Sequence, residues 1–384
     1  MKTRDPITVG VVATHPPDDP GSMRRYGELL CRCLALEGGG TGGCRSRMVH
    51  VGLASGVRRA LGTRVGTWCN HAWSFARARA AFARRRVDLW HLVDGSCGYL
   101  VPALTRAPVV VTAHDLIPWL QTQGAFPGSP APSRWGRRLI VQGLRGLARA
   151  ERIVAVSANT RRDLARAGIV PERVDVVYSA VAPEFLREEP APDTGAAGPD
   201  AAPRILHVGN SGFYKNRPAV LRTFAQVARR LGRPVTLQLV GPPETADERE
   251  VIRAEAIGDA VSRTGAGPDE ALRRHYHGAA LLLFPSLYEG FGWPPLEAMA
   301  CGCPVVCSRA ASLPEVVGDA ALTAAPDDED ALARHCLDVL LHPEVAQRLR
   351  QRGRQRAAEF SVTRMADGLR AVYARVLGAN RWNG

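Results

Sequence analysis

The stretch FPSLYEGFGWPPLEAMACG, residues 284 to 302, places two glutamates on either side of a glycine-containing loop. An apolar run, AALLLFPS (279–286), leads into it and predicts a buried strand, while the Pro-Pro pair predicts a helix start. A helix N-terminus carries unpaired N–H groups and a partial positive charge, which suit a phosphate group. Glu289 before the helix and Glu297 in its expected first turn would then flank such a phosphate.

The two carboxylates could accept hydrogen bonds from hydroxyl groups on both sides of the phosphate. The stretch therefore predicts a ligand built of sugar, phosphate and sugar, as in a nucleotide-sugar. Gly290 and Gly292 would let this ligand approach the backbone closely. A second interpretation stays open on spacing alone, in which Glu297 is only a first-turn glutamate that complements the helix dipole.

Outward from this stretch, short apolar runs alternate with segments of helical periodicity. Strands are expected at 7–13, 88–93, 107–115, 152–157, 174–181, 204–209, 235–241, 279–286 and 304–308. Helices are expected at 25–37, 159–167 (capped by Asn159), 218–231, 268–277, 294–301, 328–341 and 362–377. The Pro-, Ala- and acid-rich segment 187–203 separates two such series. This order predicts two α/β domains with parallel sheets, whose ligands bind at the carboxyl ends of the strands.

The formal charge of +13 is confined to the first half of the chain. Residues 1–186 hold 26 Arg or Lys against 13 Asp or Glu, whereas the rest holds 24 of each. We expect the basic half to face an anionic partner or membrane surface. The segment AWSFARARAAFARRR (72–86) is a candidate helix for such a contact, with a solvated basic face as the alternative.

Membrane-spanning and disulfide-based architectures are not expected. No run of about 18 apolar residues occurs, and the N-terminal apolar run is short and broken. The nine cysteines lack zinc-site spacing and suit buried thiols in a reducing compartment. A cytoplasmic protein, peripheral on the cytoplasmic membrane face at most, is the resulting expectation.

Several motifs, in order, resemble those of the retaining glycosyltransferases of family 4 (glycosyl transferases group 1). The central one is the E-x7-E pattern from Glu289 to Glu297, followed by Gly302. The others are PDDPGSMRRYGELL (17–30), VTAHDLIP (111–118), RIVAVSANTRRDLAR (152–166) with VDVVYSAV (174–181), ILHVGNSGFYKN (205–216) and SLPEVVGDAAL (312–322). Together they cover nearly the whole chain, which makes the resemblance far more specific than a lone glycine pattern.

The resemblance implies the GT-B fold, in which two Rossmann-like parallel-sheet domains face each other across a cleft. The implied parts are an acceptor domain at 1–186, a linker at 187–203, a nucleotide-sugar donor domain at 204–361 and a C-terminal helix at 362–384 that crosses back to the first domain. Removing this helix is expected to abolish activity without touching the site.

The same resemblance implies the site residues. Those assigned to catalysis are His114, Glu289 and Lys215, and those assigned to donor binding are Gly21, Ser22, Gly209, Asn210, Lys215, Gly241, Thr264, Gly265, Gly290, Phe291, Gly292 and Glu297. Lys215 would bind the diphosphate, Glu289 the transferred sugar and Glu297 the ribose. Asp115 is expected to cap the turn that follows its strand. A surface lysine is the alternative for Lys215, and a core histidine for His114.

Two positions depart from the family pattern. Tyr214 stands where the family often has an arginine directly before the lysine, and Ser22 replaces the second glycine of a pair. The first departure removes one diphosphate cation. It is the support for an alternative function, a catalytically weakened scaffold subunit that binds nucleotide-sugars.

The implied activity is transfer of a hexose from a UDP- or GDP-sugar to an acceptor hydroxyl, in polysaccharide, glycolipid or glycoconjugate biosynthesis. The acceptor is a sugar, a lipid-linked group or a small molecule. No enzyme nucleophile and no metal or other cofactor is expected, since no D-x-D motif ends a strand. Sugar-nucleotide epimerisation lacks base candidates, and nucleic-acid binding lacks a recognised module.

Overall fold

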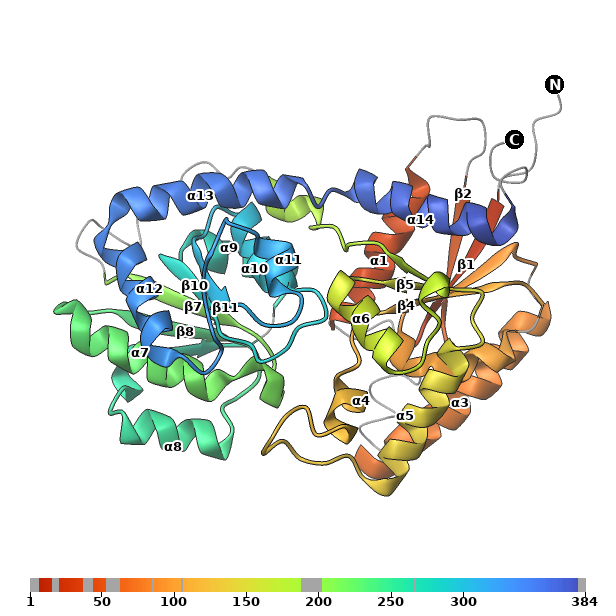
Figure 1. Cartoon of the computed structure of the whole chain (residues 1–384), viewed down its shortest axis with the longest axis horizontal. Coiled ribbons are helices and arrows are strands. Elements are labelled where there is room, and N and C mark those ends of the chain that lie inside the picture. The colour runs from red at the N-terminus through yellow and green to blue at the C-terminus, as the bar shows by residue number, and fades with distance from the viewer. Residues whose placement is uncertain are drawn as a thin grey trace. The chain divides into compact units, whose positions relative to one another are not determined.

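A computed structural model describes residues 7–15, 21–36, 44–52, 63–84, 86–104, 106–187, 202–265 and 267–378. The chain divides into two compact units (Figure 1). Unit 1 comprises Met1–Ala180 and Val362–Gly384, and unit 2 comprises Val181–Ser361. The boundary thus falls before Val181, ahead of the predicted domain end at 186. Most of the predicted linker 187–203 lies outside the described residues.

Unit 1 is built on a parallel sheet of six strands in the described residues, in the order β2-β1-β3-β4-β5-β6. The strands are β1 (Ile7–Ala13), β2 (Cys44–His50), β3 (Leu89–Leu92), β4 (Val109–Ala113), β5 (Arg152–Ala155) and β6 (Val174–Val176). Every residue of β3 and β4 is buried, because helices cover both faces of the sheet (Figure 1). The edge strand β2 alternates between half-buried and exposed residues from Cys44 to Met48, and Val49 is buried.

The helical segments of unit 1 include one that arrives from the end of the chain. They are α1 (Ser22–Ala35), α3 (Thr63–Arg84), the 3-10 segment η1 (Gly95–Ala103), α4 (Ile117–Thr122), α5 (Arg134–Leu147), α6 (Ala158–Arg166), η2 (Pro171–Arg173) and α14 (Val362–Leu377). Helix α14 packs on α1 and buries Met365, Leu369, Val372 and Tyr373. The Tyr373 hydroxyl lies 2.5 Å from Nδ1 of His91 in β3, so α14 belongs to the core of unit 1.

Unit 2 repeats the architecture with a second parallel sheet, in the order β12-β11-β10-β7-β8-β9. Its strands are β7 (Arg204–Val208), β8 (Thr236–Val240), β9 (Val261–Thr264), β10 (Leu281–Phe284), β11 (Val305–Ser308) and β12 (Leu322–Ala324). Its helical segments are η3 (Pro183–Leu186), η4 (Phe213–Lys215), α7 (Arg217–Leu231), α8 (Ala246–Ala254), η5 (Gly258–Ala260), α9 (Asp269–His277), α10 (Trp293–Ala300), α11 (Leu313–Val317), α12 (Glu329–Leu341) and α13 (Pro343–Ala358).

Each predicted strand and helix has an observed counterpart, with ends shifted by a few residues. The predicted cap at Asn159 was wrong: the cap of α6 is Ser157, whose side chain accepts a hydrogen bond from the Thr160 N–H, and Asn159 lies inside the helix. The segment 174–181 is strand only over Val174–Val176. The candidate helix at 72–86 is the second part of α3.

Two histidines buried in the sheets make stability depend on pH. Burial lowers the pKa of both His91 and His207 to about 3, whereas an unfolded histidine titrates near 6.5. Between these values only the unfolded chain binds the proton, so the free energy of unfolding should fall as pH drops below about 6.5. From pH 7 to pH 5 the loss should be roughly 2 kcal/mol for each histidine, measured by urea unfolding.

A matched pair of variants tests this pH dependence. His91→Gln and His207→Gln should each remove roughly 2 kcal/mol of the loss between pH 7 and pH 5. An unchanged slope in His91→Gln would contradict the assignment.

Candidate active site

Unit 2 has its topological switch point between β7 and β10. From β7 the chain adds β8 and β9 towards one edge of the sheet. It then adds β10, β11 and β12 towards the other edge. Loops at the carboxyl ends of two such strands part in opposite directions and leave a crevice, where open α/β sheets bind ligands. The loop after β7 carries Gly209, Asn210 and Lys215, and the loop after β10 carries Glu289.

Lys215 and Glu289 meet at this switch point as a buried ion pair. Nζ of Lys215 donates to Oε1 of Glu289 at 2.8 Å and to Oε2 at 3.1 Å. Lys215 is 9% exposed and Glu289 7%, so Lys215 is not a surface lysine. The ammonium also lies 4.9 Å from the ring centroid of Phe284 and 5.6 Å from that of Tyr214. Sequence reasoning gave the two side chains separate roles and did not foresee their pairing.

The glycines after β7 and β8 allow two turns to touch. Gly241 has φ +151°, and a Cβ there would lie 2.1 Å from the carbonyl oxygen of Gly209. Asn210 uses its side chain within its own turn, because Oδ1 accepts from the Gly212 N–H at 2.9 Å and Nδ2 donates to the Tyr214 hydroxyl at 2.9 Å. Tyr214 is therefore tied to the turn that carries Lys215.

The loop from Glu289 to Gly292 is held by hydrogen bonds from a serine that the sequence did not single out. Oγ of Ser312 lies 2.9 Å from the carbonyl oxygen of Glu289 and 2.7 Å from that of Phe291. Gly292 has φ +118° and directly precedes α10, and a Cβ there would lie 2.8 Å from the side chain of Leu313. Gly290 and Phe291 lie in this loop, with Phe291 buried. The first turn of α10 contains the Pro-Pro pair, as expected.

Glu297 does not lie in the first turn of α10. The helix begins at Trp293, so Glu297 falls one turn further along and is 2% exposed. Its Oε2 accepts a hydrogen bond at 3.0 Å from the hydroxyl of Tyr276 in α9. A glutamate that only complements the helix dipole needs neither burial nor a tyrosine partner, so the dipole interpretation is disfavoured. Tyr276 lay in a predicted helix, but no local pattern marked it as a partner.

Two further predicted donor-binding residues, Thr264 and Gly265, lie at the exposed end of β9. Thr264 ends β9 and is exposed; its hydroxyl accepts from Gln238 Nε2 at 3.0 Å, and its carbonyl accepts from the Gly241 N–H at 2.9 Å. Gly265 follows, also exposed, and a Cβ there would meet nothing within 4 Å. These positions can therefore offer backbone contacts, rather than side-chain contacts, to a nucleotide base.

His114 directly follows β4 in unit 1 and is half-buried. Its Nε2 lies 2.8 Å from the carbonyl oxygen of Val93, which only accepts, so Nε2 carries the proton. Burial lowers the pKa of His114, although the carboxylate of Asp94 opposes this shift. The ring is neutral at pH 7, and its Nδ1 lone pair can accept a hydrogen bond from a hydroxyl. Asp115 Oδ1 accepts from the Ile117 N–H at 3.0 Å, the turn-capping contact expected of it.

The N-terminal loop is described only from Gly21 onward. Gly21 caps α1 with extended backbone and Ser22 is the first helical residue, and both are exposed. The Gly21 carbonyl accepts from the Arg24 N–H at 3.1 Å. Residues 17 to 20 of the predicted loop lie outside the described part of the chain.

The described residues contain neither a cluster of metal-binding side chains nor a membrane-spanning helix. No group of three or more His, Cys, Asp or Glu side chains in them could hold a metal ion. Among these residues, no helix combines the length and the apolar character that crossing a membrane needs.

Two parallel-sheet units of this kind, with glycine turns at the carboxyl ends of the strands, have the architecture of the GT-B fold. The family model of the glycosyl transferases group 1 matches residues 196–356, and that of Glycosyltransferase Family 4 matches residues 43–185. An MMP alpha-(1->4)-mannosyltransferase of Mycolicibacterium hassiacum is 32% identical over 319 residues, which cover 78% of this chain and 74% of that protein. The chain therefore belongs to the group 1 glycosyltransferases.

Other relatives agree with this assignment. An Escherichia coli O-antigen chain mannosyltransferase B is 50% identical over 97 residues, which span 25% of this chain and only 26% of that protein. Among solved structures, the sucrose-phosphate synthase of Thermosynechococcus elongatus has a TM-score of 0.74 at 20% identity and covers 98% of this chain and all of that one. Anabaena Alr3699/HepE, solved with UDP and glucose, has a TM-score of 0.73 at 17% identity, covering 96% of this chain and 100% of that one. These two structures share the fold.

Proposed function

We propose that the protein is a retaining, metal-independent hexosyltransferase that moves a hexose from a UDP- or GDP-sugar to an acceptor hydroxyl. The buried pair of Lys215 and Glu289 at the switch point of unit 2 carries this proposal. Several relatives are named mannosyltransferases, so GDP-mannose is the first donor to test. The setting would be cytoplasmic synthesis of a polysaccharide, glycolipid or glycoconjugate.

The ion pair holds both side chains at the crevice before a donor arrives. An anionic diphosphate attracts the Lys215 ammonium, and the N-terminus of α10 adds the partial positive charge of the helix dipole, although Pro294 and Pro295 there have no N–H to donate. Glu289 then accepts hydrogen bonds from hydroxyls of the transferred sugar, while Glu297 accepts from those of the ribose. Groups that are in place before binding cost little reorganisation in the reaction.

In the proposed reaction, the bond from the sugar C1 to the diphosphate oxygen breaks as a bond from C1 to the acceptor oxygen forms on the same face. The acceptor proton passes to an oxygen of the leaving diphosphate, which balances the charge without an enzyme base. Lys215 stabilises the negative charge that develops on the diphosphate. Neutral His114 in unit 1 is assigned to the sugar through its Nδ1 acceptor.

Nucleotide binding tests the proposed donor site. UDP, GDP and ADP, with their common sugars, should be screened by thermal shift on the wild type. One nucleotide should stabilise the protein by several degrees. Glu297→Ala should remove that shift, since the ribose hydroxyls lose their acceptor. Tyr276→Phe, which removes only the hydroxyl that orients Glu297, should reduce it. No shift with any nucleotide would sink the donor-site assignment.

A non-catalytic nucleotide-sugar-binding scaffold is the alternative, favoured by Tyr214. Slow hydrolysis of the donor without an acceptor separates the two functions. An enzyme should release free hexose, with the anomeric configuration of the donor seen first by NMR. Tight nucleotide binding without any hydrolysis or transfer would favour the scaffold.

A further inference from the structure

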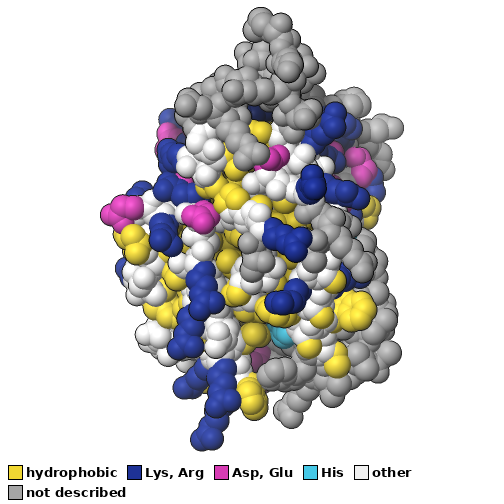
Figure 2. Space-filling view, turned by 90° about the vertical axis from the view of Figure 1, so that its right-hand side faces the viewer, with side chains coloured by type: hydrophobic (Ala, Val, Ile, Leu, Met, Phe, Trp, Pro, Cys, Tyr) yellow, Lys and Arg dark blue, Asp and Glu magenta, His cyan; other side chains and the backbone are white. Residues whose placement is uncertain are grey.

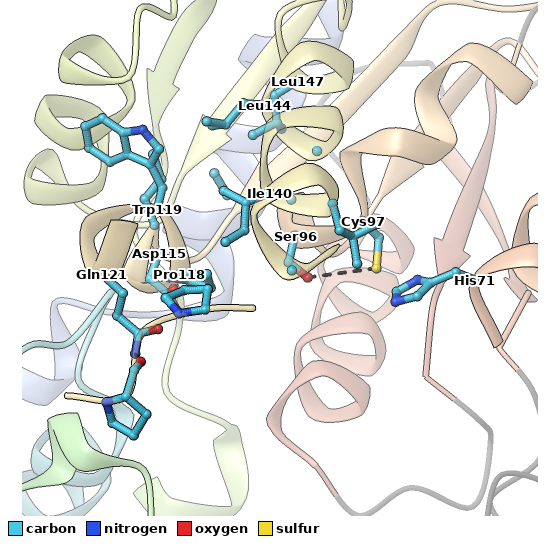
Figure 3. A pocket seen from close by; sticks show the side chains of 18 residues that line it. His71, Ser96, Cys97, Asp115, Pro118, Trp119, Gln121, Ile140, Leu144 and Leu147 are labelled. Atoms are coloured by element: carbon cyan, nitrogen blue, oxygen red, sulfur yellow. Dashed lines mark hydrogen bonds between the residues drawn. The ribbon is translucent and has the colours of Figure 1, made fainter. Parts of the chain in front are cut away.

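Unit 1 contains an open cavity of about 420 Å³ beside the carboxyl end of β4 (Figure 3). In Figure 3, Trp119 and Pro118 from α4, Ile140 and Leu144 from α5, and Cys97 from η1 surround the same space. Ala113 and Asp115, the chain neighbours of His114, also line it. A cavity of this size falls in the range of small-molecule sites, and its walls are mainly apolar.

Helix α5 forms one wall and is anchored at its C-terminal half. Gly143 and Gly146 lie against the backbone of η1, so closely that a Cβ at Gly146 would be 1.9 Å from the carbonyl oxygen of Gly98. Further towards the N-terminus, Leu139 and Ile140 face the cavity and are only half-buried. The helix thus presents aliphatic side chains that the protein itself leaves partly uncovered.

The polar side chains around the cavity already have partners within the protein. Asp115 accepts from the Ile117 N–H, and Gln121 Nε2 donates to the Pro130 carbonyl at 3.1 Å. Nδ1 of His71 lies 2.6 Å from the Tyr99 hydroxyl. Burial raises the pKa of the Cys97 thiol to about 12, so it stays protonated and unreactive. A ligand in this space would therefore meet mostly carbon.

The outer face of α5 has the opposite character. It exposes four arginines and no acidic residue: Arg134, Arg137, Arg138 and Arg145. Trp135 is 57% exposed and Val141 45%, and the guanidinium of Arg138 lies 4.7 Å from the Trp135 ring centroid. Arginine with exposed tryptophan on one helix face suits an anionic lipid surface. Figure 2 shows a face of the molecule where Lys and Arg are more frequent than Asp and Glu among the coloured side chains, with hydrophobic side chains between them.

We propose that this cavity takes the aliphatic chain of a lipid acceptor, while the arginines on the outer face of α5 contact the anionic head groups of the surrounding lipid surface. The two faces of α5 match these two contacts, since the cavity face is apolar and the outer face is positively charged. The cavity adjoins His114 in the chain, so a bound acceptor would have its head group near the strand end assigned to the sugar. This inference rests on the proposed transferase function and names its acceptor class.

Alkyl phosphates are the probe, used below their micelle concentrations in isothermal titration calorimetry. A series from butyl to dodecyl phosphate should bind the wild type more tightly by about threefold to fourfold per methylene. The gain should stop once the chain fills the cavity, whereas non-specific adsorption would continue to grow with length. Methyl phosphate should not bind measurably, because it lacks the chain.

Two neighbouring substitutions on α5 provide the matched control. Ile140→Phe fills the cavity and should weaken binding of decyl phosphate at least tenfold. Val141→Phe adds a ring on the exposed side of the same helix and should leave this binding unchanged. The double variant with Arg137→Gln and Arg138→Gln should sediment less with phosphatidylglycerol vesicles. The alkyl chain length at which the affinity measured by calorimetry stops increasing should stay the same.

Nucleotide-induced thermal shifts, measured on the same variants, separate this inference from the proposed function. Normal nucleotide shifts with no decyl phosphate binding, or with equal binding by Ile140→Phe, would overturn the lipid-chain assignment and leave the donor site standing. Tighter binding of 1-naphthyl phosphate than of decyl phosphate would overturn it in favour of an aromatic acceptor. If no nucleotide raised the melting temperature of the wild type, that result would instead count against the donor site.

Discussion

Replacing Lys215 by alanine should lower kcat/KM by about two to three orders of magnitude. The ammonium is a buried cation at the switch point of unit 2, held 2.8 Å from Glu289. In the proposed reaction, negative charge grows on the leaving diphosphate, and a pre-positioned cation in a buried site stabilises it strongly. Steady-state kinetics with the donor identified by thermal shift would measure the loss. Wild-type turnover in Lys215→Ala would refute the role of the pair.

The same substitution should also destabilise unit 2, and the two effects can be separated. Lys215→Ala leaves the Glu289 carboxylate buried without its partner, at a cost of about 3–5 kcal/mol. The double variant Lys215→Met with Glu289→Gln removes both charges, so its stability should largely recover while activity stays low. Arg222→Ala, which breaks a more exposed ion pair with Glu329 in the same unit, should change stability by no more than about 1 kcal/mol and activity not at all.

Deleting residues 362 to 384 should unfold unit 1 and abolish transfer. Helix α14 buries Met365, Leu369, Val372 and Tyr373 in the core of that unit. Losing one large core side chain costs about 2–5 kcal/mol, so losing several exceeds the usual 5–15 kcal/mol stability of a domain. Hydrogen exchange should show lost protection in β3, β4 and β5, with β7 and β10 still protected and nucleotide binding retained. A truncated protein with wild-type turnover would contradict this prediction.

Two point substitutions in α14 test the same packing even if the truncated chain aggregates. Leu369→Ala removes a fully buried side chain and should lower the free energy of unfolding of unit 1 by about 2–5 kcal/mol. Val376→Ala lies on the same helix but is only half-buried, so its cost should be clearly smaller. Equal costs for the two would show that α14 does not pack as described.

The sequence predicted the buried part of the fold better than its surface. Strands such as β4 and β10 are continuous apolar runs, and every residue in them is buried. The edge strands β2 and β9 were missed because CRSRMVH and VSRT carry polar residues on exposed positions. Helix α13 was missed for a similar reason, since PEVAQRLRQRGRQRAA is largely a solvated surface helix.

The candidate site was predictable where it follows local sequence and not where it depends on tertiary contacts. Glycine turns after strands and the helix start at the Pro-Pro pair follow from short-range rules. Tyr276 reaches Glu297 across 21 positions, and Ser312 reaches the Glu289 carbonyl across 23. No periodicity marks such partners, because folding alone brings them together. The pairing of Lys215 with Glu289, 74 positions apart, belongs to the same class.

The discontinuity of unit 1 has a consequence during protein synthesis. Unit 2, Val181–Ser361, is a single segment and is synthesised before α14. Unit 1 cannot complete its core until α14 has been made, and until then the apolar surface that Leu369 and Tyr373 later cover stays exposed. The N-terminal part of the chain is thus the last to mature, and it is the part for which a chaperone would matter most. Slowing translation after residue 361 should lengthen its exposure and increase aggregation.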